Sequence, residues 1–267
     1  MPEGDTIHRT AATLRQVLDG RELVRFAAAR LSAPFPRTGT AIGPVEARGK
    51  HLLLHFGDGL VLHTHMALSG TWHTYRTGQP WRRAVSSARA VVEVPGAVAV
   101  CFRAPVVELL DAGALRRHPV LRRLGPDLTL PDADLDAVLV RQRGAAVEGQ
   151  VLADLLLDQR PASGIGNVIM QEACFLAGVD PRSAVENVDA PLRRAVVARA
   201  HRLLVDNVAL ARRTSVPGAR QGTLWVYGRA GERCRRCGTT IESALVGDGA
   251  RPTYWCPACQ RRAGRPA

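Results

Sequence analysis

The sequence predicts an α+β multidomain protein, and three features of the chain support this fold class. Apolar residues recur at helical spacing at the start of the chain, form short alternating or apolar runs over residues 23–110, and return to helical spacing after residue 132. Two C-x-x-C pairs follow near the C-terminus. The 267 residues, 46% of them hydrophobic, suffice for one large domain or two small ones with a buried core.

The N-terminal part is predicted to be a helix followed by an all-β layer. Apolar residues share one face of a helix over residues 5–18, which Asp5 or Thr6 is expected to cap. Runs such as KHLLLHF, GLVLHTHM and AVVEV, separated by Gly or Pro, are typical of strands. There is no long apolar run and no low-complexity tract, which disfavours membrane spans and disorder. The opening MPEGDT does not look like a secretory leader, so we expect a cytoplasmic protein that does not contact the membrane.

The remainder is predicted to contain a linker, helices and a loop. Helices are expected over residues 147–158, 168–177 and 190–211, and the Gly- and Arg-rich stretch 212–223 is expected to be a mobile loop. The expected domains are a helix and β layer over 1–112, a Gly- and Pro-rich linker over 113–132, a helical domain over 133–222, a cysteine ribbon over 223–262 and a basic tail over 263–267.

Four of the six cysteines have the spacing of a metal site. They form two C-x-x-C pairs separated by 18 residues: Cys234, Cys237, Cys256 and Cys259. Two such knuckles form a closed tetrahedral cage suited to one structural Zn²⁺, whereas a redox dithiol would explain one pair but not two. Cys101 and Cys174 lie in apolar runs and are predicted to be small buried side chains.

The charge balance points to a polyanionic partner. The chain carries 36 basic and 24 acidic residues, a formal net charge of +12, and every basic residue except Lys50 is Arg. The alternative is a solvated basic surface in a protein from a high-GC coding background. Residues 229–265 contain eight Arg against three acidic residues, an excess that favours phosphate contacts by the cysteine ribbon.

Two local motifs could carry chemistry. The turn GIGN can direct backbone N–H groups of Gly164 and Gly166, and the amide of Asn167, at a phosphate, although most such turns are merely tight. If Met1 is removed, Pro2 presents a secondary amine, which is a nucleophile, beside the Glu3 carboxylate, which can exchange a proton. Pro near a helix start is most often only a favourable first-turn residue.

These motifs together resemble the formamidopyrimidine-DNA glycosylase and endonuclease VIII family. The resemblance covers almost the whole chain in order, from PEG at the start and GKHLL to LLLDQRPASGIGN, QEACFLAGVDP, VYGRAGERCRRCG and RPTYWCPACQ. It implies an N-terminal helix plus β-sandwich, a helix–two-turn–helix module and a C-terminal zinc-finger hairpin. It also implies that damaged DNA, in a duplex with the lesion flipped out, is the partner, bound by a monomer in the cytoplasm.

The resemblance also implies residue roles. Pro2 is similar to the nucleophile that attacks C1′, Glu3 to the general acid, and Lys50 to the lysine that holds the phosphate beside the lesion. Asn167 and Arg251 match phosphate-binding residues, and Leu68 matches the wedge that fills the gap left by the flipped base. Apart from the resemblance, the alternation of histidines along a strand face leads us to expect that His65 touches a phosphate. Glu172 also matches a family Glu, with a structural charge partner as the alternative interpretation.

The chain departs from the family at two places. Thr6 stands where the family has a second acidic residue in the opening helix, and Asp5 lies one position earlier. The Pro-Arg-Arg-Phe-Gly element of the formamidopyrimidine branch is missing. This absence and the Arg-Pro-x-Tyr-Trp-Cys hairpin favour the endonuclease VIII branch, which acts mainly on oxidised pyrimidines.

The sequence therefore predicts a DNA glycosylase with abasic-site lyase activity in base-excision repair. The alternatives are a purine-directed formamidopyrimidine glycosylase, a non-catalytic protein that binds damaged DNA, and a zinc-ribbon accessory factor. His63, His65 and His73 could suggest a second metal site, but their alternation is more economically explained as a strand face. Trp225 and Tyr227 are expected to pack the ribbon against the helices rather than to stack on bases.

Overall fold

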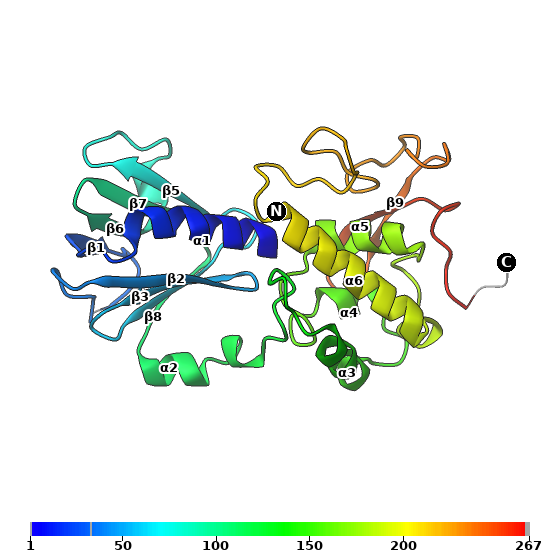
Figure 1. The fold of residues 1–267 in the computed structure, drawn as a ribbon, viewed down its shortest axis with the longest axis horizontal. Helices are drawn as coiled ribbons and strands as arrows, with labels where there is room; N and C mark the ends of the chain where they lie inside the picture. The colour runs from blue at the N-terminus through cyan, green and yellow to red at the C-terminus, as the bar shows by residue number, and fades with distance from the viewer. Residues whose placement is uncertain (1, 33, 265–267) are drawn as a thin grey trace. The chain divides into compact units, whose positions relative to one another are not determined.

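The computed structural model describes residues 2–32 and 34–264, and the chain folds as two compact units. Unit 1 comprises Met1–Arg122 and unit 2 comprises Arg123–Ala267. Unit 1 combines one long helix with most of the described strands, whereas unit 2 is mainly helical and ends in a hairpin (Figure 1). This architecture confirms the predicted α+β class.

Helix α1 (Gly4–Leu18) opens unit 1 and is amphipathic. The predicted cap was wrong: the N-cap residue is Glu3, and Asp5 lies in the first turn, where its carboxylate accepts the Thr6 backbone N–H at 2.7 Å. The helix buries four apolar side chains at spacings of three and four residues: Ile7, Ala11, Leu14 and Leu18.

Two antiparallel four-stranded sheets make up the rest of the sandwich. The first has the order β1 (Arg25–Ala27), β6 (Ala88–Val94), β7 (Ala97–Phe102), β5 (Thr71–Arg76). The second has the order β2 (Ile42–Arg48), β3 (His51–Phe56), β4 (Val61–His65), β8 (Val106–Leu110). Helix α1 contacts strands of both sheets, and the core between them is apolar, with Leu52, Leu54, Leu62, Val92 and Ala99 all almost fully buried. The predicted helix plus β-sandwich is therefore confirmed.

The predicted Gly- and Pro-rich linker contains regular structure. Helix α2 (Ala112–Arg117) begins directly after β8, because the Asp111 carboxylate accepts the Ala114 N–H at 2.7 Å and caps it. A 3-10 turn, η2 (Leu121–Arg123), follows. The Gly and Pro content did not reveal this short capped helix.

The described residues of unit 2 form four α-helices around an apolar core. They are α3 (Leu135–Ala145), α4 (Leu152–Leu157), α5 (Asn167–Ala177) and α6 (Ala190–Asn207). The sequence missed α3, which Asp134 caps and which buries only Val138 and Gln142, too few for a clear periodic pattern. The predicted helix over 147–158 was too long, because it starts at Leu152, and α6 ends at Asn207 rather than at 211. Asp189 caps α6, as predicted.

The C-terminal hairpin pairs β9 (Glu242–Val246) with β10 (Arg251–Trp255). The predicted basic tail begins at Ala263, which donates its N–H to the Ser183 hydroxyl at 3.0 Å. Residues 265–267 of this tail lie outside the described residues. Within the described part of the chain, every helix is too short or too polar to cross a membrane.

Candidate functional site

The N-terminal residues of unit 1 place an imino acid and a carboxylate side by side at the head of α1. Glu3 is fully buried, and its carbonyl accepts the N–H groups of Thr6 at 2.9 Å and Ile7 at 3.0 Å. The positive end of the helix dipole favours a carboxylate at this position. Pro2 precedes it and is half-buried, while Met1 lies outside the described residues. If Met1 is removed, the Pro2 nitrogen becomes a secondary amine, and a nucleophile and a proton-exchanging carboxylate then lie at one helix end.

Lys50 occupies the turn between β2 and β3. Arg48 pairs with His51, so Gly49 and Lys50 form a two-residue hairpin loop. Gly49 has φ +58, a conformation that the first position of such turns requires and that side chains resist. The Lys50 side chain is half-buried. The turn thus fixes the chain's one lysine at the end of the sheet.

Leu68 projects from the loop between β4 and β5. It is 75% exposed, and the preceding residue, Ala67, has φ +46. Gly70 closes the loop by donating its N–H to the Met66 carbonyl at 2.8 Å, and a Cβ on Gly70 would lie 2.6 Å from that oxygen. Only glycine fits at position 70, and it closes the loop tightly. In this loop the large apolar side chain of Leu68 lies in solvent. Such a side chain suits insertion between bases.

His65 lies at the end of β4, directly opposite His51 in the β3–β4 register. The two ring centroids are 4.8 Å apart. Burial lowers the pKa of His65, and the charge of Lys50 lowers it further, so the ring is neutral at physiological pH. Sequence reasoning placed His65 near a phosphate but missed its contact with His51.

The GIGN turn of unit 2 is buried, and part of it serves the fold itself. Gly164 has φ +102 and donates its N–H to the Gln159 side-chain oxygen at 3.0 Å. That N–H is therefore engaged within the protein, contrary to the expectation that it points at an anion. Gly166 is the N-cap residue of α5 and has no side-chain cap hydrogen bond. Anion binding at the start of this helix stays a prediction.

Asn167 and Arg251 are brought together at the contact between α5 and β10. The Asn167 side-chain amide donates to the Pro252 carbonyl at 2.9 Å, and the Gln171 amide donates to the same oxygen at 3.0 Å. Gln171 also accepts the Tyr254 N–H at 2.9 Å. Arg251, next to Pro252, is exposed. The sequence missed Gln171, which is fully buried and fixes β10 on α5.

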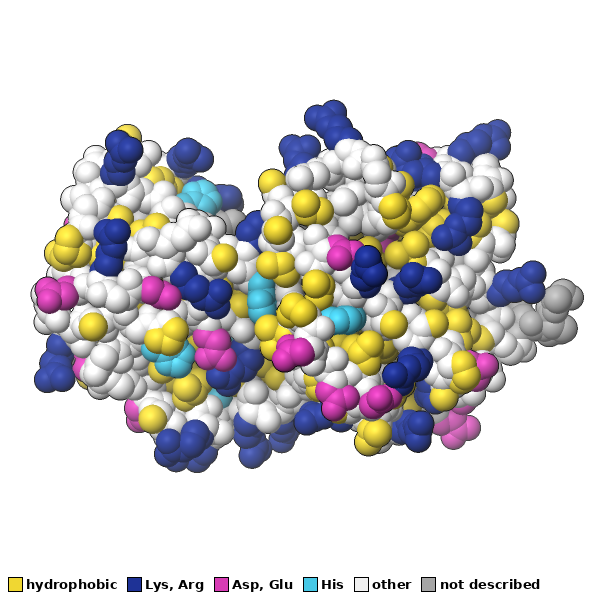
Figure 2. Space-filling model, viewed as in Figure 1, with side chains coloured by type: hydrophobic (Ala, Val, Ile, Leu, Met, Phe, Trp, Pro, Cys, Tyr) yellow, Lys and Arg dark blue, Asp and Glu magenta, His cyan; other side chains and the backbone are white. Residues whose placement is uncertain are grey.

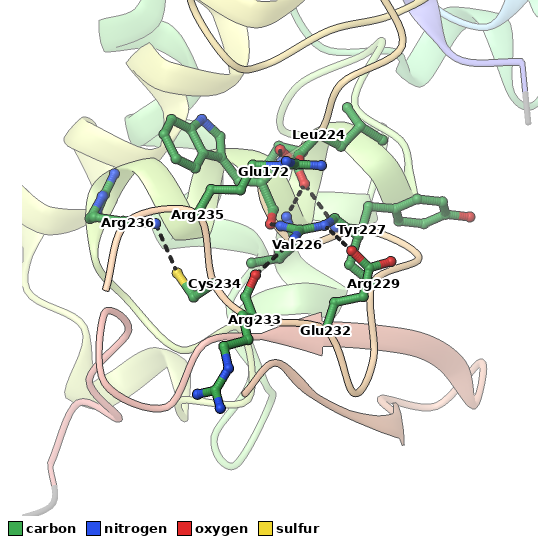
Figure 3. A network of polar contacts seen from close by, with 11 residues as sticks. Glu172, Leu224, Val226, Tyr227, Arg229, Glu232, Arg233, Cys234, Arg235 and Arg236 are labelled. Atoms are coloured by element: carbon green, nitrogen blue, oxygen red, sulfur yellow. Dashed lines mark hydrogen bonds and ion pairs between the residues drawn. The ribbon is translucent and has the colours of Figure 1, made fainter. Parts of the chain in front are cut away.

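Glu172 organises the segment that leads into the zinc-finger hairpin. This fully buried carboxylate accepts backbone N–H groups from Trp225 (2.8 Å), Val226 (2.9 Å) and Tyr227 (2.9 Å), and the Ser215 hydroxyl donates to it as well. Figure 3 shows its side chain reaching this stretch. These donors to Glu172 are neutral N–H and O–H groups of the protein itself, so its contacts are structural, but they are not the charge pairing that the alternative interpretation expected.

Arg229 extends this arrangement to the first cysteine knuckle. Its guanidinium donates to the carbonyls of Trp225 and Arg233 and forms an ion pair with Glu232 at 2.9 Å (Figure 3). The Trp225 ring stacks on Phe175 of α5, with centroids 5.1 Å apart, which agrees with its predicted packing role. The loop 212–223 is closed at its base, where the Ser215 N–H bonds the Thr223 carbonyl at 3.1 Å; its mobility stays a prediction.

The four predicted cysteine ligands converge. The Sγ atoms of Cys237 and Cys256 are 3.4 Å apart, those of Cys234 and Cys259 are 3.9 Å apart, and all four lie within 4.8 Å of one another. No pair is joined as a disulfide. Four thiols at these separations fit one tetrahedral Zn²⁺ in a closed structural site. The other two cysteines, Cys101 and Cys174, are fully buried, as predicted.

The basic side chains do not gather in one patch on the face drawn in Figure 2. They are spread over both units, with fewer acidic side chains between them. This distribution is consistent with a generally cationic surface. It does not single out any one group of basic residues on this face as a binding site.

Comparisons with known proteins agree with these features. Residues 1–105 match the formamidopyrimidine-DNA glycosylase N-terminal domain, and residues 231–262 match the zinc finger found in FPG and IleRS. The chain is 40% identical over 266 residues to the probable endonuclease 8 2 of Streptomyces coelicolor, covering 97% of this chain and 94% of the relative.

Two further relatives and two solved structures extend the comparison. The DNA-(apurinic or apyrimidinic site) lyase Nei2 of Mycolicibacterium smegmatis is 39% identical, with 97% and 99% of the two chains covered, and the endonuclease 8 of Escherichia coli is 33% identical, with 97% and 100% covered. A Lactococcus lactis Fpg complex with DNA and an inhibitor has a TM-score of 0.82 at 20% identity, covering 98% of this chain and 100% of that chain. A MutM complex with DNA containing carbocyclic 8-oxo-G has a TM-score of 0.81 at 21% identity, with the same coverage. Their likeness shows a shared fold, and the full-length similarity to the endonuclease 8 proteins places this chain in the formamidopyrimidine-DNA glycosylase and endonuclease VIII family.

Proposed function

We propose that this protein is a bifunctional DNA glycosylase and abasic-site lyase of base-excision repair. The observation that carries the proposal is the head of α1, where Pro2 stands beside the buried carboxylate of Glu3. A relative 39% identical over nearly its whole length is named a DNA-(apurinic or apyrimidinic site) lyase, which supports the same chemistry here. A protein that only bound DNA would need neither group.

In the proposed reaction the Pro2 nitrogen attacks C1′ of the damaged nucleoside. The bond from C1′ to the base breaks, and the base leaves with the proton that the Pro2 amine gives up. Glu3 donates a proton to the sugar ring oxygen as the ring opens, which leaves a cationic iminium between Pro2 and C1′. The iminium withdraws electrons and acidifies the C2′ proton. Loss of that proton expels the 3′ phosphate and cuts the strand, and water then releases the enzyme.

The other residues act on the DNA backbone and the gap in the duplex. Lys50 binds the phosphate beside the lesion, and Asn167 and Arg251 bind phosphates from unit 2. Leu68 fills the space that the extruded nucleotide leaves, since C1′ is shielded in the duplex. His65 and the start of α5 at Gly166 assist phosphate binding. The zinc ion stabilises the hairpin that carries Arg251 and takes no part in bond breaking.

The proposed substrates are oxidised pyrimidines in duplex DNA. The missing Pro-Arg-Arg-Phe-Gly element and the similarity to endonuclease 8 proteins support this branch. The alternative is purine-directed activity. A panel of thymine glycol, 5-hydroxyuracil and 8-oxoguanine in duplex, bubble and single-stranded DNA distinguishes them, and faster excision of 8-oxoguanine than of thymine glycol contradicts the pyrimidine assignment.

Borohydride trapping on abasic DNA tests the chemistry. Reduction of the iminium should yield a stable protein–DNA adduct. Digestion of the adduct and sequencing by mass spectrometry should locate the attachment at Pro2. A form that retains Met1 should give no adduct at Pro2. Glu3→Gln should bind abasic DNA but excise an intact lesion at least ~100-fold more slowly, the range expected for loss of a general acid. The exposed Glu22→Gln variant is the matched control and should behave as the native protein.

Tight binding of damaged DNA by the native protein with neither an adduct nor strand cleavage would identify a non-catalytic damage-binding protein instead. Light scattering of the free protein and of its DNA complex tests the expected monomer, with a mass of 28.8 kDa for the free chain.

A further inference from the structure

Four histidines and one glutamate form a continuous cluster on the outer face of one sheet of unit 1. His51 lies on β3, His63 and His65 lie on β4, Glu108 lies on β8, and His118 follows α2. Their neighbours along the strands, such as Leu52, Leu62 and Val107, belong to the apolar core, so the alternation of strand side chains places this cluster on the opposite face. The sequence revealed the alternation on β4 but not the convergence of β3, β8 and α2.

The hydrogen bonds in the cluster specify which ring nitrogens carry protons. His118 Nδ1 accepts the backbone N–H groups of Val120 at 3.2 Å and Leu121 at 3.1 Å, so its proton lies on Nε2, which donates to Glu108 Oε2 at 3.1 Å. The same carboxylate oxygen accepts from His63 Nδ1 at 2.9 Å.

The assignment continues to His51. Because the proton of neutral His63 is on Nδ1, its Nε2 must accept, and the donor is His51 Nδ1 at 2.9 Å. This bond places a proton on His51 Nδ1, and burial together with the neighbouring charges keeps the ring neutral, so Nε2 is unprotonated. Its exposed fraction is 7% and that of His63 is 1%, so water can replace few of these bonds.

The same tautomers argue against a metal ion between His63, Glu108 and His118, although their ligand atoms lie within 4.8 Å of one another. A metal on His118 Nε2 would need a lone pair there, which moves the proton of the neutral ring to Nδ1. That proton would face the N–H groups of Val120 and Leu121. Ligating histidines instead donate their second N–H to an acceptor. The cluster is therefore a hydrogen-bonded chain.

This chain ends beside Lys50. His51 follows Lys50 directly, and His65 is opposite His51. Burial, together with the neighbouring His65, His63, His118 and Lys50, lowers the pKa of His51 to about 3. Burial also lowers the pKa of His63, although Glu108 opposes this. Burial raises the pKa of Glu108, but hydrogen bonds from His63 and His118 outweigh it and the net pKa is lowered.

We propose that His51 is a positioning residue for Lys50: the chain His118–Glu108–His63 fixes its tautomer and its burial keeps it a neutral imidazole, so that it adds no positive charge beside the lysine ammonium. An imidazolium at this place would repel the ammonium and compete with it for the same phosphate. The role of Lys50 as the phosphate-binding lysine rests on the proposed function, whereas the charge state of His51 does not.

The chain also directs any proton that reaches His51. If a proton binds at His51 Nε2, the His51 Nδ1–H bond breaks as an N–H bond forms at His63 Nε2. His51 remains neutral in its other tautomer, and the positive charge resides on His63, next to the Glu108 carboxylate. The charge is thus moved one residue away from Lys50 and compensated there.

Nuclear magnetic resonance of the whole free protein tests the charge state directly. In ¹⁵N-labelled protein at pH 7, His51 should show a protonated Nδ1 and an unprotonated Nε2, with no imidazolium forming between pH 8 and pH 5. Loss of the signals in His51→Gln assigns them. A His51 titration midpoint near its ordinary value of about 6.5 would overturn the proposal whatever the activity of the enzyme.

The link to Lys50 is tested by the pH dependence of strand cleavage at an abasic site. In His63→Ala, His51 loses much of its burial, which outweighs the loss of its hydrogen-bond acceptor, so the pKa of His51 should rise towards about 6.5. Cleavage should then fall roughly tenfold between pH 7.5 and pH 5.5 relative to the native protein, because about nine-tenths of His51 would be charged. The double variant His51→Gln/His63→Ala, which cannot form this cation, should lose the extra fall.

The matched control is His73→Ala on β5, whose ring bonds Tyr75 outside the cluster, and it should keep the native pH profile. Parallel profiles for His63→Ala and the native protein, or an acid fall that persists in the double variant, would overturn the link. If the native protein cleaves no abasic DNA, the proposed function fails, and the resonance experiment still decides the state of His51.

Discussion

The β-sandwich of unit 1 and the zinc-finger region of unit 2 hold candidate DNA-binding residues by different physical means. The sandwich positions Lys50 on a hairpin loop, and Leu68 on the loop that connects its two sheets, around an extensive apolar core. The zinc-finger region has a small core in which two of the five buried residues are themselves cysteine ligands: Phe175, Val226, Cys234, Ile241 and Cys256. It relies on thiol ligation and a buried carboxylate. We therefore expect that loss of a zinc ligand will unfold the zinc-finger region, and that truncation of a core side chain will destabilise the sandwich.

Removal of one zinc ligand should have the largest effect and should be confined to unit 2. Cys256→Ser eliminates a buried thiolate, and structural zinc sites of this type contribute on the order of 10 kcal/mol to folding. We expect loss of bound zinc and of hydrogen-exchange protection over residues 224–262, with protection retained in the sandwich strands. Cys101→Ala should keep one zinc per chain. Loss of protection in both units would show that the regions are not independent.

A core truncation in the sandwich should have the opposite signature. Leu54 is 1% exposed within the core, and Leu54→Ala should destabilise unit 1 by about 3–4 kcal/mol through lost burial and the resulting cavity. Denaturant unfolding followed by hydrogen exchange measures this change. Zinc content should stay at one per chain, and release of zinc together with unfolding of the sandwich would contradict the separation.

The buried carboxylate of α5 should matter less than a core leucine but more than a surface glutamate. Glu172→Gln places an NH₂ group among N–H donors and should destabilise unit 2 by about 2–3 kcal/mol. Hydrogen exchange of the Trp225, Val226 and Tyr227 amides measures the effect. Glu232→Gln is the matched control: its side chain is 57% exposed, and losing its ion pair should change the stability by less than about 1 kcal/mol.

The smallest effect on stability is expected at Leu68. Because its side chain is 75% exposed, Leu68→Ala should change the free energy of unfolding by no more than about 0.5 kcal/mol. Excision of a paired lesion should nevertheless fall on the order of tenfold, because the wedge compensates for unstacking. Cleavage at an abasic site opposite a gap should change little. Equal losses on both substrates would contradict a wedge role.

Local chemistry made several features predictable. The cysteine spacing correctly predicted four converging thiols, since a C-x-x-C knuckle fixes two ligands through backbone geometry alone. Helical spacing predicted α1, and alternation predicted the strands. The α1 cap was wrong because Asp5 looked like a suitable acceptor, whereas the helix begins one residue earlier at Gly4. Helix α3 was missed because it buries too few apolar side chains to produce a periodic signal.

Contacts between distant segments were not predictable in the same way. Gln171 carries no motif of its own, and its importance arises only because β10 lies against α5 and needs a donor and an acceptor there. Gly164 looked like an anion-binding glycine, but the side chain of Gln159 takes its N–H. Nothing in the sequence around Glu172 reveals that the stretch 225–227 folds back onto it.

The sequence by itself determined the α+β class, the zinc ligands and the pairing of Pro2 with Glu3, because each depends on residues close together in the chain or on a strong periodic pattern. Only the tertiary structure decided the charge state of His51 and the structural contacts of Glu172. Protonation and hydrogen bonding depend on burial and on partners from several elements, and those partners are defined only when the sheet and the helices have packed.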